Sequence, residues 1–184
     1  MRDLSLHILD LAQNSVRANA ALVEIMVSVD ESRLITITIR DDGSGMSDEL
    51  KERVTSPFAT TRTTRKVGLG IPLMMQNARL AGGDVRIDST LGQGTTLTAT
   101  LHGDSLDCLP LGDLAGTVVS LVSANPERPD FRLSCSSPKG SMDFDTREMR
   151  QALGNVPLNE PEITAWMLSA IQEEIEPIFG GVIL

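Results

Sequence analysis

The stretch LITITIRDDGSGM (34–46) decides the fold, because it joins a strand pattern directly to a polar, glycine-rich turn. Thr36 and Thr38 alternate with isoleucines, which is typical of a strand with one buried face. The preceding LVEIMVSV (22–29) alternates in the same way, and a polar turn (30–32) separates the two. We therefore predict two strands joined by a turn, the second of which runs straight into DDGSGM.

An amphipathic helix is predicted upstream, over residues 3–20. Apolar residues recur there at helical spacing and form a broad side that can pack against the strands. The polar residues of this segment share one face, because they recur at steps of three, four and three (His7, Asp10, Asn14 and Arg17).

Downstream of the turn, SDELKERV (47–54) predicts a short helix with Ser47 as its N-cap. Residues 55–67 lack periodicity and are predicted to be a loop. The next segment, 68–83, opens with GLG and continues as a largely buried helix. A hairpin over 84–102 follows, with a GQG turn between its strands.

After His102 the chain carries a second set of predicted strands and helices. We predict strands over 116–124 and 131–137 and a helix that begins at Asp145. An apolar stripe around Trp166 predicts a last helix, in which Trp166 belongs to the core or to an interface with the preceding part.

Composition limits the class of protein. The 184 residues are 41% hydrophobic and 22% charged, which is typical of a globular chain. No run of 18 apolar residues is present, so no membrane span is expected, and the first 20 residues do not resemble a signal peptide. With two cysteines and no metal-ligand spacing, we expect a reducing cytoplasm.

The net charge of −9 is unevenly distributed. Residues 1–102 hold 11 basic and 12 acidic side chains, whereas residues 103–184 hold 5 and 13. Neither part offers the basic surface of a general nucleic-acid binder, so no nucleic acid is expected. The acidic part is interpreted as a solvated surface or as a face for a basic partner protein.

Four motifs occur in a meaningful order: D-x-x-x-N on a helix, D-D-G-S-G after a strand, G-L-G opening a helix and G-Q-G-T before a strand. This order resembles the GHKL ATPases, which comprise gyrase-type topoisomerases, histidine kinases, MutL-type repair proteins and heat-shock chaperones. The resemblance covers residues 3–102. It implies a Bergerat-type ATP-binding fold, an α/β (α+β) sandwich, over residues 1–102, followed by a small acidic α/β unit over 103–184 without an assigned role.

In that family the first motif holds magnesium and activates water. The resemblance makes Asn14 the ligand of a Mg²⁺ ion that bridges the phosphates of ATP, and it makes Asp10 the catalytic base. An amide oxygen suits Mg²⁺, which prefers oxygen ligands. The family ATPases usually carry Glu where this chain has Asp10, so hydrolysis is expected to be slow. The alternative is a merely solvated polar face.

The second motif is expected to bind adenine. By resemblance, Asp41 accepts a hydrogen bond from the adenine amino group, and Gly43 and Gly45 let the backbone approach the base and sugar. Asp42 is expected to face solvent. Taken alone, the same string is also typical of a tight turn.

The third motif is expected to bind phosphates. Gly68, Leu69 and Gly70 would present backbone N–H groups at a helix N-terminus. Arg62 and Lys66 lie just upstream, in the dense basic cluster of residues 1–102, and resemble part of a lid over the nucleotide. A flexible, solvated loop is the alternative, and the two interpretations are compatible.

Two further residues are of interest. By resemblance, Thr95 in the fourth motif supports Asp41 and its water by hydrogen bonding, although the string by itself indicates only a hairpin turn. His7 lies one turn before Asp10, and three roles stay open for it: phosphoacceptor, aid to the base, or a hydrogen-bonding residue. The helical hairpin that carries the phosphoacceptor of histidine kinases is not expected upstream of a motif that starts this close to Met1.

The sequence therefore predicts a Mg-dependent, ATP-binding protein of the histidine-kinase-like type. Three uses of ATP stay open: a slow ATPase or ATP-gated switch, a kinase that phosphorylates a separate protein in the manner of anti-sigma factors, and a non-enzymatic nucleotide-sensing module. A partner protein is expected, and a homodimer is an open alternative.

Overall fold

The two strands at the centre of the sequence analysis also form the centre of the sheet. β1 (Leu22–Val29) and β2 (Leu34–Asp41) pair antiparallel, with Val23 opposite Asp41. The structure is a computed structural model that describes residues 1–55 and 69–180. The predicted ranges for both strands are confirmed to within one residue.

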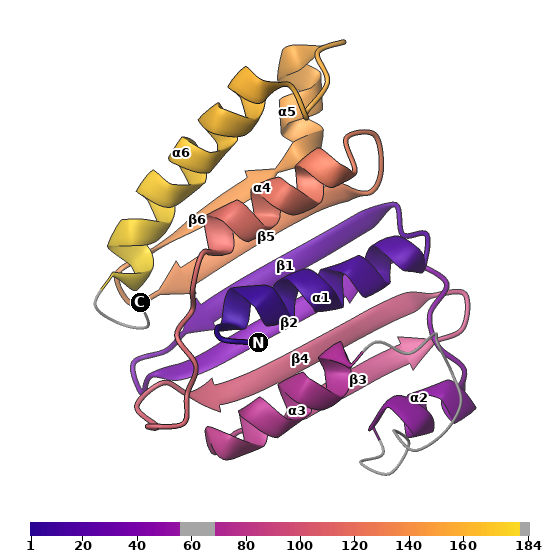
Figure 1. Cartoon of the computed structure of the whole chain (residues 1–184), viewed down its shortest axis with the longest axis vertical. Helices are drawn as coiled ribbons and strands as arrows, with labels where there is room; N and C mark the ends of the chain where they lie inside the picture. The colour runs from indigo at the N-terminus through magenta and orange to yellow at the C-terminus, as the bar shows by residue number, and fades with distance from the viewer. Residues whose placement is uncertain (56–68, 181–184) are drawn as a thin grey trace.

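Four further strands extend this pair on both sides. They are β3 (Val85–Thr90), β4 (Gly94–His102), β5 (Asp130–Ser137) and β6 (Gly140–Asp145). Within the described residues the six strands form one sheet in the order β3-β4-β2-β1-β5-β6 (Figure 1). β1 and β5 run parallel while the other pairs are antiparallel, so the sheet is mixed, and it passes from the residues before His102 into those after it.

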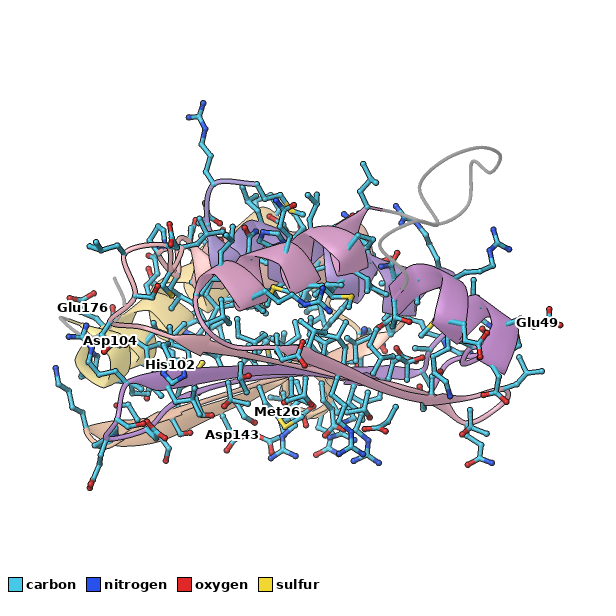
Figure 2. The ribbon with its side chains drawn as sticks, turned by 90° about the horizontal axis from the view of Figure 1, so that it is seen from below. Met26, Glu49, His102, Asp104, Asp143 and Glu176 are labelled. Carbon is cyan, nitrogen blue, oxygen red and sulfur yellow. The ribbon has the colours of Figure 1, made fainter. Side chains whose placement is uncertain are left out.

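The helices cover one face of the sheet, and the other face is open (Figures 1 and 2). In Figure 2, Met26 and Asp143 project from the side opposite the helices. The helices are α1 (Leu4–Arg17), α2 (Asp48–Thr55), α3 (Gly70–Leu80), α4 (Leu114–Ala124), α5 (Thr146–Leu153) and α6 (Pro161–Phe179). Buried and half-buried residues alternate along β1 and β2, because only the side under the helices is removed from water. The predicted α/β sandwich is confirmed.

Residues 116–124 are not the predicted strand, because they lie in α4. Asp113 caps this helix by accepting a hydrogen bond from the backbone N–H of Gly116 at 2.8 Å. Leu114, Val118 and Leu121 are all buried, since α4 packs against α1, α6 and β5. A helix that is apolar on every side is one that is buried, and this tertiary burial overrides the strand preference of its valines.

The last helix also differs from expectation. Its buried stripe runs through Met167, Ile171 and Ile175, as the apolar period predicts, but Trp166 lies outside it and is 59% exposed. The prediction that Trp166 belongs to the core is therefore wrong, because it sits one position away from the buried stripe. β6 was not predicted at all, since its alternation is weak.

Candidate nucleotide-binding site

The site is built on α1, whose polar face looks toward α3. Asp3 caps the helix by accepting a hydrogen bond from the backbone N–H of Leu6 at 2.9 Å. Leu4 and Ile8 are fully buried and hold the helix on the sheet; full burial of such a side chain contributes about 2 kcal/mol. Asp10 and Asn14 lie one turn apart and are half-buried.

Asp41 is the buried acidic side chain of the site. It ends β2 and is only 9% exposed. Its Oδ2 accepts a hydrogen bond of 2.6 Å from the hydroxyl of Ser15, and its Oδ1 accepts one of 2.9 Å from the backbone N–H of Gly43. Both bonds are assisted by the charge of the carboxylate and fix its orientation.

A cavity of about 300 Å³ opens beside this carboxylate. Its polar lining includes Asn14, Ser15, Arg17, Asp41, Ser44 and Thr95, and its apolar lining includes Leu11, Ile39, Met46, Leu50, Val54, Ile71 and Leu97. The volume is at the lower end for ligand pockets. An apolar slot with one buried carboxylate can take a flat aromatic ring that offers an N–H group as a donor.

The DDGSGM turn reaches this cavity through a tight backbone contact. Gly45 lines the cavity and has a φ of +63°, and a Cβ there would lie 2.0 Å from the carbonyl oxygen of Thr90. Gly43 lies nearby in the same turn, and a Cβ there would lie 2.8 Å from the carbonyl oxygen of Ala18. These glycines allow backbone segments of the protein to approach one another; a contact with the base or sugar stays a prediction.

Asp42 follows Asp41 but has a different role. It is exposed as predicted, and its Oδ1 accepts hydrogen bonds from the backbone N–H groups of Ala21 at 2.7 Å and Leu22 at 2.9 Å. Partial desolvation raises the pKa of Asp42, but the backbone hydrogen bonds, chiefly those from Leu22 and Ala21, together with the charge of Arg128 bring the pKa below its ordinary value. Asp42 therefore ties the end of β2 to the start of β1.

The start of α3 lies against Asp10. A Cβ on Gly70 would be 2.2 Å from Oδ2 of Asp10, so only glycine leaves that carboxylate in place. The first N–H groups of a helix have no partner within it, and they attract anions. Leu69 precedes Gly70 and is 62% exposed. Among the described residues, no hydrogen bond or ion pair of the Asp10 side chain is present.

His7 is fully buried between α1 and α3. Its Nε2 lies 2.7 Å from Nδ2 of Asn77, and its Nδ1 is buried without a hydrogen-bond partner among the described residues. Burial, followed by the N-terminal charge, lowers the pKa of His7 below its ordinary value, although Asp10 and Asp3 act in the opposite direction. Of the three roles left open for His7, this geometry favours the hydrogen-bonding one.

Thr95 lies opposite Asp41 in the register of β2 and β4, as the fourth motif suggests. Its hydroxyl is 2.9 Å from the hydroxyl of Ser89, which also accepts from the backbone N–H of Met46 at 2.8 Å. The side-chain partner of Asp41 is instead Ser15. Among the described residues, Thr95 therefore belongs to a network that links the β3–β4 hairpin to the DDGSGM turn, and its support of Asp41 and a bound water stays a prediction.

Three predicted site residues, Arg62, Lys66 and Gly68, lie outside the described residues. One site residue was missed by sequence reasoning, namely Ser15. A signal for it exists, because Ser15 continues the apolar spacing of Leu4, Ile8 and Leu11. A polar side chain at a core position requires a buried partner, and here the partner is Asp41.

A sheet with helices on one face, a buried carboxylate in an apolar cavity and a helix N-terminus beside it define a nucleotide-binding α/β sandwich. A family model described as histidine kinase-, DNA gyrase B- and HSP90-like ATPase matches residues 2–105, more than half of the chain. The chain therefore belongs to this family and carries its ATP-binding domain. The GHKL resemblance of the motifs is confirmed.

Individual relatives share part of the chain. An uncharacterized sensor-like histidine kinase of Rhizobium meliloti is 33% identical over 88 residues, 44% of this chain and 17% of that protein. The sensor histidine kinase WalK of Bacillus subtilis is 30% identical over 100 residues, 50% of this chain and 16% of that protein. The chain thus matches less than a fifth of the length of either relative.

A solved structure is similar in fold over nearly the whole chain. The N-terminal domain of a DNA repair protein superposes with a TM-score of 0.52 at 16% identity, and it covers 98% of this chain and 58% of that one. The likeness shows the fold alone, and it is not confined to the residues that the family model matches. In the part of the chain that the structure describes, no helix has the length and apolar character needed to cross a membrane.

Proposed function

We propose that this chain binds ATP together with Mg²⁺ in the described cavity and uses it as a slow ATPase or ATP-gated switch. The observation that carries the proposal is Asp10: a half-buried carboxylate one turn from Asn14, held against Gly70 at the start of α3 and unpartnered among the described residues. The helix dipole favours a carboxylate at this place, and a carboxylate without a hydrogen-bond partner keeps its oxygens available to a ligand.

The base end of the nucleotide is assigned to Asp41. Each oxygen of Asp41 accepts one bond, from Ser15 or from Gly43, so each keeps a further lone pair, and Asp41 lines the cavity. Such a lone pair could accept a hydrogen bond from an exocyclic amino group. The apolar lining of Ile39 and Leu97 then covers the faces of the ring. This combination favours adenine over a base that presents a carbonyl at the same place.

The donor set fits magnesium as it usually occurs with nucleotides. Among the described residues no group of three or more His, Cys, Asp or Glu side chains could hold a metal by itself. Mg²⁺ commonly takes only one or two protein ligands, with phosphates and water completing its octahedron. The amide oxygen of Asn14 at the rim of the cavity would supply such a ligand. When bound, the ion would neutralise phosphate charge.

The role assigned to Asp10 is that of a base. Its carboxylate would accept a proton from a water molecule that attacks the terminal phosphate. Because an Asp side chain is one methylene shorter than Glu, the reach of this base is reduced, and slow turnover follows. If transfer goes to a separate protein instead, the same carboxylate would act on a hydroxyl or imidazole of that protein.

The experiment compares Asp10→Asn, Asp10→Glu and Asn14→Ala with wild type, using calorimetric ATP affinity and steady-state phosphate release. Asn14→Ala should weaken Mg-ATP binding. Asp10→Asn should leave binding nearly intact and lower phosphate release roughly 10²- to 10⁴-fold, the usual contribution of a general base. Asp10→Glu should retain or raise release.

Asp48→Asn is the matched control, because Asp48 is an exposed carboxylate at the start of α2. It should change neither quantity. Equal background release from wild type, Asp10→Asn and Asp10→Glu would remove the ATPase role. Transfer of labelled phosphate to a co-purified protein would then identify a kinase, and binding without transfer would identify a nucleotide-sensing module.

A further inference from the structure

The turn that follows α1 forms one wall of the nucleotide cavity. Ala18 lines the cavity, and its carbonyl oxygen accepts a 2.9 Å hydrogen bond from the backbone N–H of Ser44 in the DDGSGM turn. The next residue, Asn19, has a φ of +57°, a left-handed conformation that asparagine adopts more readily than most residues other than glycine. The backbone of this turn is also bonded by side chains from other parts of the chain.

Two charged side chains hold it. Asp42 accepts from the N–H groups of Ala21 and Leu22, as described above. Arg128 supplies the complementary donors: its Nε donates to the carbonyl oxygen of Ala20 at 3.2 Å and its Nη2 to that of Asn19 at 3.3 Å. The N–H groups and the carbonyls of the turn are thus bound by side chains of opposite charge.

Arg128 comes from the acidic segment after His102, more than 100 residues away in sequence. It lies just before β5, which pairs parallel with β1 from Leu22 and Asp130 onward. The N–H of Asp130 also donates to the carbonyl of Ala21 at 2.9 Å. The parallel pairing of β5 therefore brings the guanidinium to the turn.

The same segment also holds the other end of α1. The carbonyls of Pro110 and Leu111 accept hydrogen bonds of 2.9 and 2.8 Å from the N–H groups of Leu4 and Ser5. These are first-turn donors, which a helix cannot satisfy internally. Both ends of the helix that carries Asp10, Asn14 and Ser15 are thus fixed by residues beyond 102.

We propose that Arg128 is a positioning residue of the nucleotide site. Through Arg128, the segment 103–184 fixes the position of the cavity wall that would lie beside the adenine base. Arg128 does not line the cavity, so its effect passes through the turn and Ala18. The proposal rests on the proposed placement of ATP, with its base beside Asp41. A contact that shifts β5 would, by the same route, change nucleotide affinity.

The test compares Arg128→Ala and Arg128→Lys with Arg132→Ala, using calorimetric affinities for ATP, ADP and adenosine. Arg132 is the matched control, because it lies in β5 and pairs with Glu24 and Asp143 instead of the turn. Arg128→Ala should weaken all three ligands by a similar factor, about 3- to 10-fold, since one or two hydrogen bonds are lost. Arg128→Lys should be intermediate, because an ammonium lacks the planar fork that bonds two carbonyls.

Arg132→Ala should bind as wild type does. Affinities of Arg128→Ala that equal those of Arg132→Ala would overturn the proposal, as would a loss that appears only with the phosphate-bearing ligands. Hydrogen exchange at the amides of Ala21 and Leu22 supplies a second readout, which needs no nucleotide. Exchange there should be faster in Arg128→Ala and in Arg128→Lys than in Arg132→Ala, and unchanged exchange would also overturn the proposal.

The two readouts separate this proposal from the proposed function. If wild type binds no ATP, the proposed function fails, while faster exchange at Ala21 and Leu22 would still show that Arg128 holds the turn. If wild type binds ATP and neither readout responds to Arg128→Lys, the positioning role fails alone.

Discussion

The hydroxyl of Ser15 donates a 2.6 Å hydrogen bond to Oδ2 of Asp41, and the bond is buried between α1 and the end of β2. It joins the helix that carries the proposed magnesium ligand to the strand end that carries the proposed adenine acceptor. The Ser15–Asp41 bond would therefore fix the position of the adenine end of a bound nucleotide relative to its phosphate end. The first of four predictions concerns this bond.

Ser15→Ala should weaken ATP binding by about 10-fold or more, because a hydrogen bond to a charged group is worth roughly 1.5–3 kcal/mol. The alanine leaves Oδ2 of Asp41 buried without its donor and lets the carboxylate rotate. Calorimetry measures the effect. Ser28→Ala, in β1, is the control and should bind normally. Equal affinities of the two variants would show that Ser15 does not orient Asp41.

Asp41→Asn and Asp42→Asn should differ sharply. Asn at position 41 can point an amide donor toward the adenine amino group, so ATP affinity should fall at least 10-fold. Asn at position 42 keeps an acceptor oxygen for the N–H groups of Ala21 and Leu22, so the loss should be much smaller. Calorimetric affinities in the reverse order would show that the base does not lie beside Asp41.

Gly70→Ala should lower phosphate release by at least about 10-fold while the fold persists. The added Cβ would lie 2.2 Å from Oδ2 of Asp10, and a side-chain carboxylate can rotate away more easily than a backbone can move. Alanine also has a higher helix propensity than glycine. Release is measured at saturating ATP.

Two variants serve as controls for Gly70→Ala. Gln76→Ala, on the exposed side of α3, should release phosphate as wild type does. In an Asp10→Ala background, Gly70→Ala should have no further effect, since the displaced group is gone. Additive losses in the double variant would argue that Gly70 acts independently of Asp10.

His7 should make the fold less stable in mild acid. Burial lowers its pKa, so between the folded and unfolded pKa values the unfolded chain binds more protons. Stability is therefore full above the unfolded pKa, near 6.5, and falls as the pH drops from there toward the lower folded pKa. Melting temperatures at pH 7.5 and 5.5 should differ more in wild type than in His7→Gln. The exposed His102 is the control, and His102→Gln should keep the wild-type difference; identical shifts in all three proteins would contradict the prediction.

Much of the fold follows from local patterns. The strict alternation in 22–29 and 34–40 and the helical spacing around Asp10 and Asn14 were sufficient to place β1, β2 and α1, because periods of 2 and 3.6 are set by the backbone itself. The motif order then led to Asp41 and Gly70, which the structure places at the cavity and against Asp10. Local patterns failed at 116–124, where a β-branched apolar run fits a strand or a buried helix equally well.

The sequence by itself determined the family, the ATP-binding class that the family implies, and the elements of residues 1–55 and 69–102. Only the tertiary structure decided that Ser15 orients Asp41, that α4 is a helix packed on α1, and that Arg128 reaches the turn after α1. The reason is physical. The periodicity of a helix or strand is visible in residues that are close in sequence, whereas the Ser15–Asp41 bond spans 26 positions and the Arg128–Ala20 bond spans 108. Such contacts form only when the parallel pairing of β5 with β1 and the packing of α1 on the sheet bring these distant residues together.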